Sequence, residues 1–186
     1  MSTPAPSEID LRYPVGKFKR PSVAITSADR AADIREIEML PAKLSAAVAG
    51  LTEDQLGVTY RPGGWTLRQV VNHVADSHMN SYVRFRWALT EDSPLIKAYD
   101  EKAWAELTDA KSAPVTLSLG LLDGLHARWV ILLRSMCDWA DDSAFAKTLQ
   151  HPENGEMRLD TMLALYAWHC RHHTAHITET RKRHGW

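Results

Sequence analysis

Four histidines lie within eight positions near the carboxyl end of the chain, in the segment WHCRHHTAHI. They are His169, His172, His173 and His176. At about 100° per residue of α-helix, all four project within a sector of about 100°. Residues four positions apart have Cβ atoms roughly 5–6 Å apart, so two such imidazoles can converge on one metal ion. The pairs His169/His173 and His172/His176 both have this spacing.

The histidine face also carries apolar residues, including Leu165 and Ile177, and is therefore expected to face the protein interior. Burying several imidazoles is costly because their polar nitrogens need partners and a low dielectric disfavours their charged form. A metal ion removes both penalties. A single histidine more often has only a hydrogen-bonding role, but four on one face favour a metal site over a hydrogen-bonded cluster.

A catalytic metal site commonly has three protein ligands and one open position, so another helix must supply a third ligand. The preceding long helical segment offers His73 and His78, and spacing alone does not choose between them. His126, on the next long helical segment, is a weaker candidate, and we interpret it as an interior or packing residue. His151 and His184 are expected to be ordinary exposed residues.

The two cysteines, Cys137 and Cys170, are too few for a disulfide framework. Cys170 follows His169, so the chain lacks the His-Glu-x-x-His pattern of zinc metalloproteases. Cys170 projects about 100° away from His169 on a helix and is interpreted as a packing residue. We expect a reducing, cytoplasmic location, because the N-terminal segment also lacks the pattern of a signal peptide.

Composition excludes two classes of partner. The formal net charge is −1, with no basic stripe of the kind that gathers phosphates, so nucleic acid is not expected. No uncharged apolar run approaches the roughly 20 residues that span a bilayer, so no membrane partner is expected. A small-molecule substrate is the expected partner.

Helical periodicity predicts the elements that position the histidines. Residues 1–26 are rich in Pro and Ser and predict an extended N-terminal arm over a single domain, 27–186. Residues 27–50 predict one helix, kinked at Pro41 and ended by Gly50.

Three further long helices follow. Thr66 and Gln69 form a capping-box pattern ahead of the second, and a short connecting helix is expected over 99–107. The third is expected from about Val115 to Trp139.

The Asn154-Gly155 pair predicts a turn in a small β-hairpin, and Asp160 is expected to cap the last helix. The fold class predicted is all-α, an antiparallel four-helix bundle with a kinked first helix. Such bundles hold metal sites in their cores.

The motifs YPVGKF, GGWTLRQVVNHVADSHMNSYVRF, YDEKAW and YAWHCRHHTAHITE resemble the YfiT-like branch of the DinB-like metal-binding proteins, from about Tyr13 to Trp186. This resemblance implies a usually dimeric four-helix bundle, here a homodimer, with one divalent ion per chain. It implies His73, His169 and His173 as the metal ligands. His172 and His176 would then line the pocket or support the ligands.

The resemblance also implies an activity. YfiT-like proteins are described as metal-dependent hydrolases, and relatives with the same bundle are S-transferases or isomerases that use low-molecular-weight thiols. Either chemistry fits an ion that activates water or a thiol, and Zn and Ni both suit imidazole ligands. Asp76 and Glu179 are candidate hydrogen-bond partners of the ligands, although each also suits a solvated helix face. The alternative is a non-catalytic metal-binding or stress-related binding protein.

Overall fold

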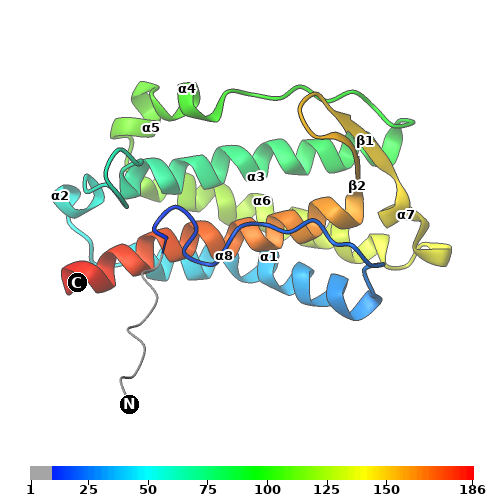
Figure 1. Cartoon of the computed structure of the whole chain (residues 1–186), viewed down its shortest axis with the longest axis horizontal. Coiled ribbons are helices and arrows are strands. Elements are labelled where there is room, and N and C mark those ends of the chain that lie inside the picture. Colours follow the sequence, from blue (N-terminus) through cyan, green and yellow to red (C-terminus); the bar gives the residue numbers. More distant parts are fainter. Residues whose placement is uncertain (1–9) are drawn as a thin grey trace, which may run out of the picture.

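Four long helices form the body of the protein (Figure 1). A computed structural model describes residues 10–186, so residues 1–9 of the expected arm lie outside the described part. The bundle and the small hairpin before the last helix are both confirmed. Its long helices are α1 (Ser27–Val48), α3 (Leu67–Thr90), α6 (Val115–Met136) and α8 (Leu159–His184).

The helices form a ring in which α1 packs on α6 and α8, and α3 packs on the same two helices. The α1/α6 and α3/α8 pairs run antiparallel, while α3/α6 and α1/α8 run parallel (Figure 1). This order arises because the chain returns along the outside of the bundle after α3. That return contains α4 (Glu101–Ala105) and α5 (Thr108–Ser112), where one connecting helix was expected.

Capping boxes begin α1, the short α2 (Glu53–Leu56) and α3. Thr26, Thr52 and Thr66 each accept a hydrogen bond from the backbone N–H three residues on, and the side chain there returns the bond. The Thr66 box was predicted. α1 continues through the buried Pro41 as one helix, and the kink itself stays a prediction.

The hairpin pairs β1 (Thr148–His151) with β2 (Gly155–Arg158) in antiparallel register. Gly155 has a φ of +67°, which glycine adopts without steric cost. β2 runs directly into α8, whose Leu159 N–H bonds to the Lys147 carbonyl. The prediction that Asp160 caps this helix is wrong, because the helix begins one residue earlier, at Leu159. Asp160 lies in the first turn, where its carboxylate accepts from the Thr161 N–H at 2.6 Å.

α6 ends at Met136, three residues before the expected Trp139. A turn of 3₁₀ helix, η1 (Ala140–Asp142), and α7 (Ser143–Ala146) then lead to the hairpin. Asp141 and Asp142 have φ values of +51° and +56°, outside the helical region, so the chain changes direction there.

The described part of the N-terminal segment runs as coil along α8 (Figure 1). The Trp168 indole N–H donates to the Gly16 carbonyl at 3.0 Å, and Tyr13 packs beside His172. The Arg20 guanidinium donates to the Glu156 carbonyl at 2.8 Å. Residues 12–20 therefore contact both the histidine face of α8 and the hairpin.

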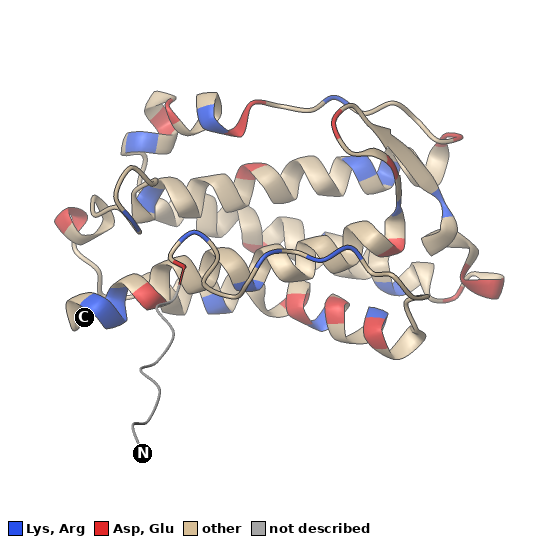
Figure 2. Cartoon of the chain, viewed as in Figure 1, with Lys and Arg blue, Asp and Glu red and all other residues tan. Residues whose placement is uncertain are grey.

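Positively and negatively charged residues are interspersed along the described chain (Figure 2). By length and composition alone, α6 is apolar enough to cross a membrane. It is nevertheless a bundle helix, because His126, Trp129 and Leu133 are buried between its neighbours.

Candidate metal centre

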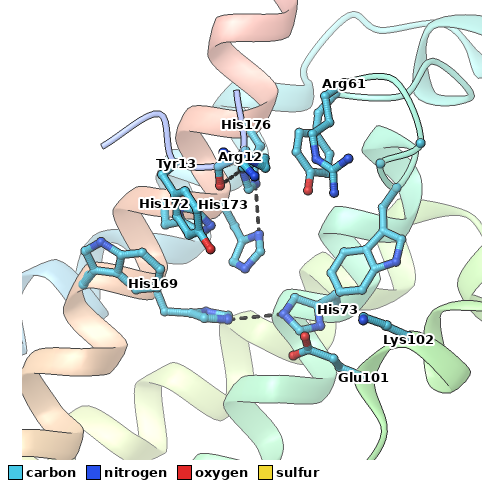
Figure 3. Close-up of a pocket in the computed structure, with 15 residues that line it drawn as sticks. Arg12, Tyr13, Arg61, His73, Glu101, Lys102, His169, His172, His173 and His176 are labelled. Atoms are coloured by element: carbon cyan, nitrogen blue, oxygen red, sulfur yellow. Dashed lines mark hydrogen bonds between the residues drawn. The ribbon is translucent and has the colours of Figure 1, made fainter. Parts of the chain in front are cut away.

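Histidines from α3 and α8 point towards one another at one cavity (Figure 3). His73 on α3 and His169 and His173 on α8 each offer a ring nitrogen, and these nitrogens lie within 4.8 Å of one another. The Nε2 atoms of His73 and His169 are 3.3 Å apart. Two nitrogens bound to Zn²⁺ at about 2.0–2.1 Å with a tetrahedral angle lie about 3.3–3.4 Å apart, so this pair fits one ion.

A second histidine trio lies one turn further along α8. His172, His173 and His176 also place ring nitrogens within 4.8 Å of one another, and His173 belongs to both trios. The first trio joins two helices and the second lies on one. Both trios use histidines of the α8 face that the sequence predicted.

Aromatic side chains enclose the two trios. Trp65, from the loop before α3, lies 4.6 Å from the His73 ring between centroids. Tyr60 stacks on His176 at 4.0 Å, and Trp168 stacks on His172 at 4.3 Å. The rings hold the imidazoles in place and limit their access to water.

Burial keeps the imidazoles neutral. It lowers the pKa of His73 to about 4, with a smaller contribution from His172. Burial also lowers the pKa of His169 and of His173 well below the ordinary value, helped by the neighbouring imidazoles. At pH 7 these rings therefore carry lone pairs for a metal ion.

His78, which spacing left as an alternative to His73, lies behind His169. Its Nε2 is 3.0 Å from His169 Nδ1, and its Nδ1 is 2.9 Å from His126 Nε2. His126 Nδ1 in turn donates to the Ile37 carbonyl at 2.6 Å. His126 is an interior residue, as expected.

The remaining candidates are the histidines of the second trio, His172 and His176, and the carboxylates Asp76 and Glu179. His176 Nδ1 lies 3.3 Å from His173 Nδ1, and the buried His172 Nδ1 has no hydrogen-bond partner among the described residues. Asp76 is half-buried, and burial together with Asp109 raises its pKa to about 6. Asp76 and Glu179 are not among the residues that line the cavity at the trio.

A cavity of about 500 Å³ opens onto the first trio (Figure 3). Its lining includes residues that sequence reasoning did not identify as functional: Arg12, Tyr13, Tyr60, Arg61, Trp65, Glu101, Lys102 and Trp168. They come from the N-terminal segment, the 60–65 loop, α4 and α8. Most of them lie within the motifs that carry the family resemblance, YPVGKF, GGWTLRQ, YDEKAW and YAWHC, or in the loop YRPGGW. These motifs indicate the family and a loop but give the residues no chemical role.

Cys170 is buried, and burial raises the pKa of its thiol, so the thiol stays protonated. This is consistent with a packing role. Cys137 is exposed and distant in sequence from the trio. His184 is exposed, as expected. His151 was expected to be exposed but is half-buried, because it lines a second cavity between the hairpin and the return segment.

A four-helix bundle whose histidine trio lies at a cavity and could hold a metal ion has the architecture of a class of helical metal-binding proteins. Residues 36–177 match the DinB superfamily. The chain belongs to that superfamily.

Its relatives include two proteins named "Putative metal-dependent hydrolase". The one from Bacillus cereus strain B4264 is 55% identical over 95% of this chain and 99% of its own. The one from Bacillus thuringiensis subsp. konkukian strain 97-27 is 54% identical over the same shares. YfiT from Bacillus subtilis, a solved structure described as "a probable metal-dependent hydrolase with an unusual four-helix bundle topology", has a TM-score of 0.90 and 48% identity. The match covers 96% of this chain and 99% of YfiT.

Proposed function

We propose that this protein is a metal-dependent enzyme whose single divalent ion is held by His73, His169 and His173. The observation that carries the proposal is the pair of Nε2 atoms 3.3 Å apart, within a neutral histidine trio that opens onto a cavity of about 500 Å³. The names of the relatives support metal dependence and hydrolysis. Zn²⁺ and Ni²⁺ are the proposed ions because both suit imidazole nitrogen.

An ion in such a site lowers the pKa of a water or thiol that it binds, which supplies a nucleophile at neutral pH. The chain's own residues prepare this chemistry. Burial keeps the three imidazoles neutral, and the aromatic rings around them limit competing water. The cavity wall also carries charged side chains of both signs, the cations Arg61 and Lys102 and the carboxylate Glu101.

Two reactions fit this site, hydrolysis and transfer of a low-molecular-weight thiol. Hydrolysis is favoured by the names of the relatives. Thiol transfer needs room for two reactants, and a second cavity of about 610 Å³ supports it. Glu101, Lys102 and His169 line both cavities. A non-catalytic metal-binding role is the remaining alternative.

An activity panel separates these alternatives. Metal-loaded protein is incubated with ester and amide substrates without thiol, and with electrophiles such as monochlorobimane plus several thiols. Thiol-independent turnover that needs the metal supports the hydrolase, and metal-dependent conjugation supports the transferase. Failure of both, with the ion confirmed in place, would favour the non-catalytic role.

We also propose a cytoplasmic homodimer formed through the outer face of α6. Leu117, Leu121 and Ile131 are 66%, 47% and 71% exposed along that face. Gly120 and Gly124 lie between them with open space above their Cα atoms. The exposed Arg128 also lies on this face, with its guanidinium 5.7 Å from the centre of the Tyr82 ring. A largely apolar face of this kind suits a two-fold contact in which the same face of each copy meets the other.

Leu121→Lys should dissociate the dimer, because it places a charge in the centre of this contact. Light scattering should give twice the mass of the 21.0 kDa chain for the unmodified protein and the single mass for the variant. Leu95→Lys is the matched control, since Leu95 is 77% exposed but lies on the return segment. A monomeric unmodified protein would refute the dimer.

A further inference from the structure

We propose that a series of hydrogen bonds from the Ile37 carbonyl through His126 and His78 fixes the tautomer of His169 and presents its Nε2 lone pair to the metal ion. We call this series the relay. The inference rests on the proposed metal site. It assigns positioning roles to two histidines that do not belong to either trio. The relay is a row of three hydrogen bonds that runs from α1 through α6 and α3 to α8.

The relay begins at a carbonyl that its own helix does not use. In an α-helix the carbonyl of residue 37 accepts the N–H of residue 41. Here residue 41 is proline, which has no N–H. The freed Ile37 carbonyl instead accepts from His126 Nδ1 at 2.6 Å. Because a carbonyl only accepts, the proton of His126 must lie on Nδ1.

The position of that proton determines those of the next two rings. A neutral imidazole has one N–H, so His126 Nε2 accepts and His78 Nδ1 donates across 2.9 Å. His78 Nε2 then accepts from His169 Nδ1 across 3.0 Å. The remaining nitrogen of His169, Nε2, therefore carries a lone pair, and it lies 3.3 Å from His73 Nε2.

Burial leaves the relay few alternative partners. His78 is 0% exposed and His126 is 1% exposed. Trp129 and Tyr166 pack against the His78 ring in edge-on contacts, with centroids 5.7 and 5.1 Å away. A buried ring nitrogen without a hydrogen-bond partner is unfavourable, which favours the single arrangement with every bond made. A metal-ligating histidine gains orientation from such a partner on its other nitrogen.

His173 has a shorter version of the same arrangement. Its Nδ1 is 3.3 Å from His176 Nδ1, and His176 Nε2 donates to the Arg12 carbonyl across 3.4 Å. His176 Nδ1 is then the acceptor, so His173 Nδ1 carries its proton and His173 Nε2 carries a lone pair. These contacts are longer than those behind His169. Both arrangements favour the trio with His73 over the trio on α8 alone.

The direct test is to assign the histidine tautomers by ¹⁵N NMR in the full-length, metal-free protein. The relay predicts the Nδ1–H tautomer for His126, His78 and His169. An Nε2–H tautomer at His169, or exchange between both forms, would overturn it. This measurement needs no bound metal, so it can fail while the metal site itself stands.

Variants of His126 test the consequence for metal affinity. His126→Leu leaves all three proposed ligands in place but ends the relay, and should weaken Zn²⁺ binding about 10–100-fold in a chelator competition. His126→Gln offers an amide N–H to Ile37 and an oxygen to His78, so it should recover most of the affinity. His184→Leu, at the exposed end of α8, should bind like the unmodified protein.

The outcomes of these titrations are distinct. Equal affinity of His126→Leu and the unmodified protein would refute the relay and leave the metal site intact. Absence of Zn²⁺ binding by the unmodified protein would refute the proposed function, and with it the role of the relay in orienting a metal ligand. If His126→Leu does not fold, the tautomers of the unmodified protein and the affinity of His126→Gln still decide.

Discussion

Replacing His169 with alanine should abolish metal binding and all metal-dependent activity, whereas replacing its neighbour Cys170 should preserve most of both. His169 is the point where the His73 contact and the His78 hydrogen bond meet. Its removal takes away one of three proposed ligands and leaves His78 without its partner. We expect metal affinity to fall by more than about 10²-fold, beyond the 10–100-fold typical of losing a group that only supports a ligand.

Cys170 is the matched control because it directly follows His169 in sequence and is itself buried, at 1% exposed. Burial raises the pKa of its thiol, so no thiolate is available there to attack a substrate. Metal content and turnover of both variants would be measured together, with circular dichroism to check folding. Loss of activity in Cys170→Ala with the metal retained would show that the cysteine takes part in the chemistry.

Acidification of the metal-free protein should unfold the bundle between about pH 6.5 and pH 4. Burial lowers the pKa of His73, His126 and His172 to about 4 in the folded chain. Because the unfolded chain binds these protons near pH 6.5, the stability is fully present above that pH and is lost as the pH falls towards 4. The three histidines act in the same direction, so acidification should remove a substantial part of the roughly 5–15 kcal/mol that stabilises an ordinary domain.

Circular dichroism of the helices during an acid titration measures this loss. Bound Zn²⁺ should move the transition to lower pH, since the ion competes with protons for the ligand nitrogens. His184→Leu should not move it, because His184 is exposed. A metal-free protein that keeps its helices unchanged to pH 4 would contradict the neutral, buried histidine cluster.

The histidine face of α8 could be predicted because its information is local. Spacing on one helix places His169 and His173 together without any knowledge of the fold. The same spacing equally supports His172 with His176, and both trios occur in the structure. His73 came from the family resemblance, since its distance from α8 depends on how two helices pack.

The relay could not be predicted, because it depends on the positions of four helices at once. Pro41 signalled only a kink in sequence, yet its missing N–H leaves the Ile37 carbonyl free for His126. The parallel α3/α6 pair was also not anticipated, since it follows from the path of the chain after α3 (Figure 1). The cavity residues on the N-terminal segment and loops carry no periodic signal that would identify them.

The most direct measurement is a crystal structure of the Zn²⁺-loaded protein with anomalous scattering recorded at the zinc edge. We predict one anomalous peak per chain, bound by the Nε2 atoms of His73, His169 and His173, with a further coordination position open to the cavity of about 500 Å³. A peak bound by His172, His173 and His176, or a fourth protein ligand that closes the site, would contradict the proposed metal centre.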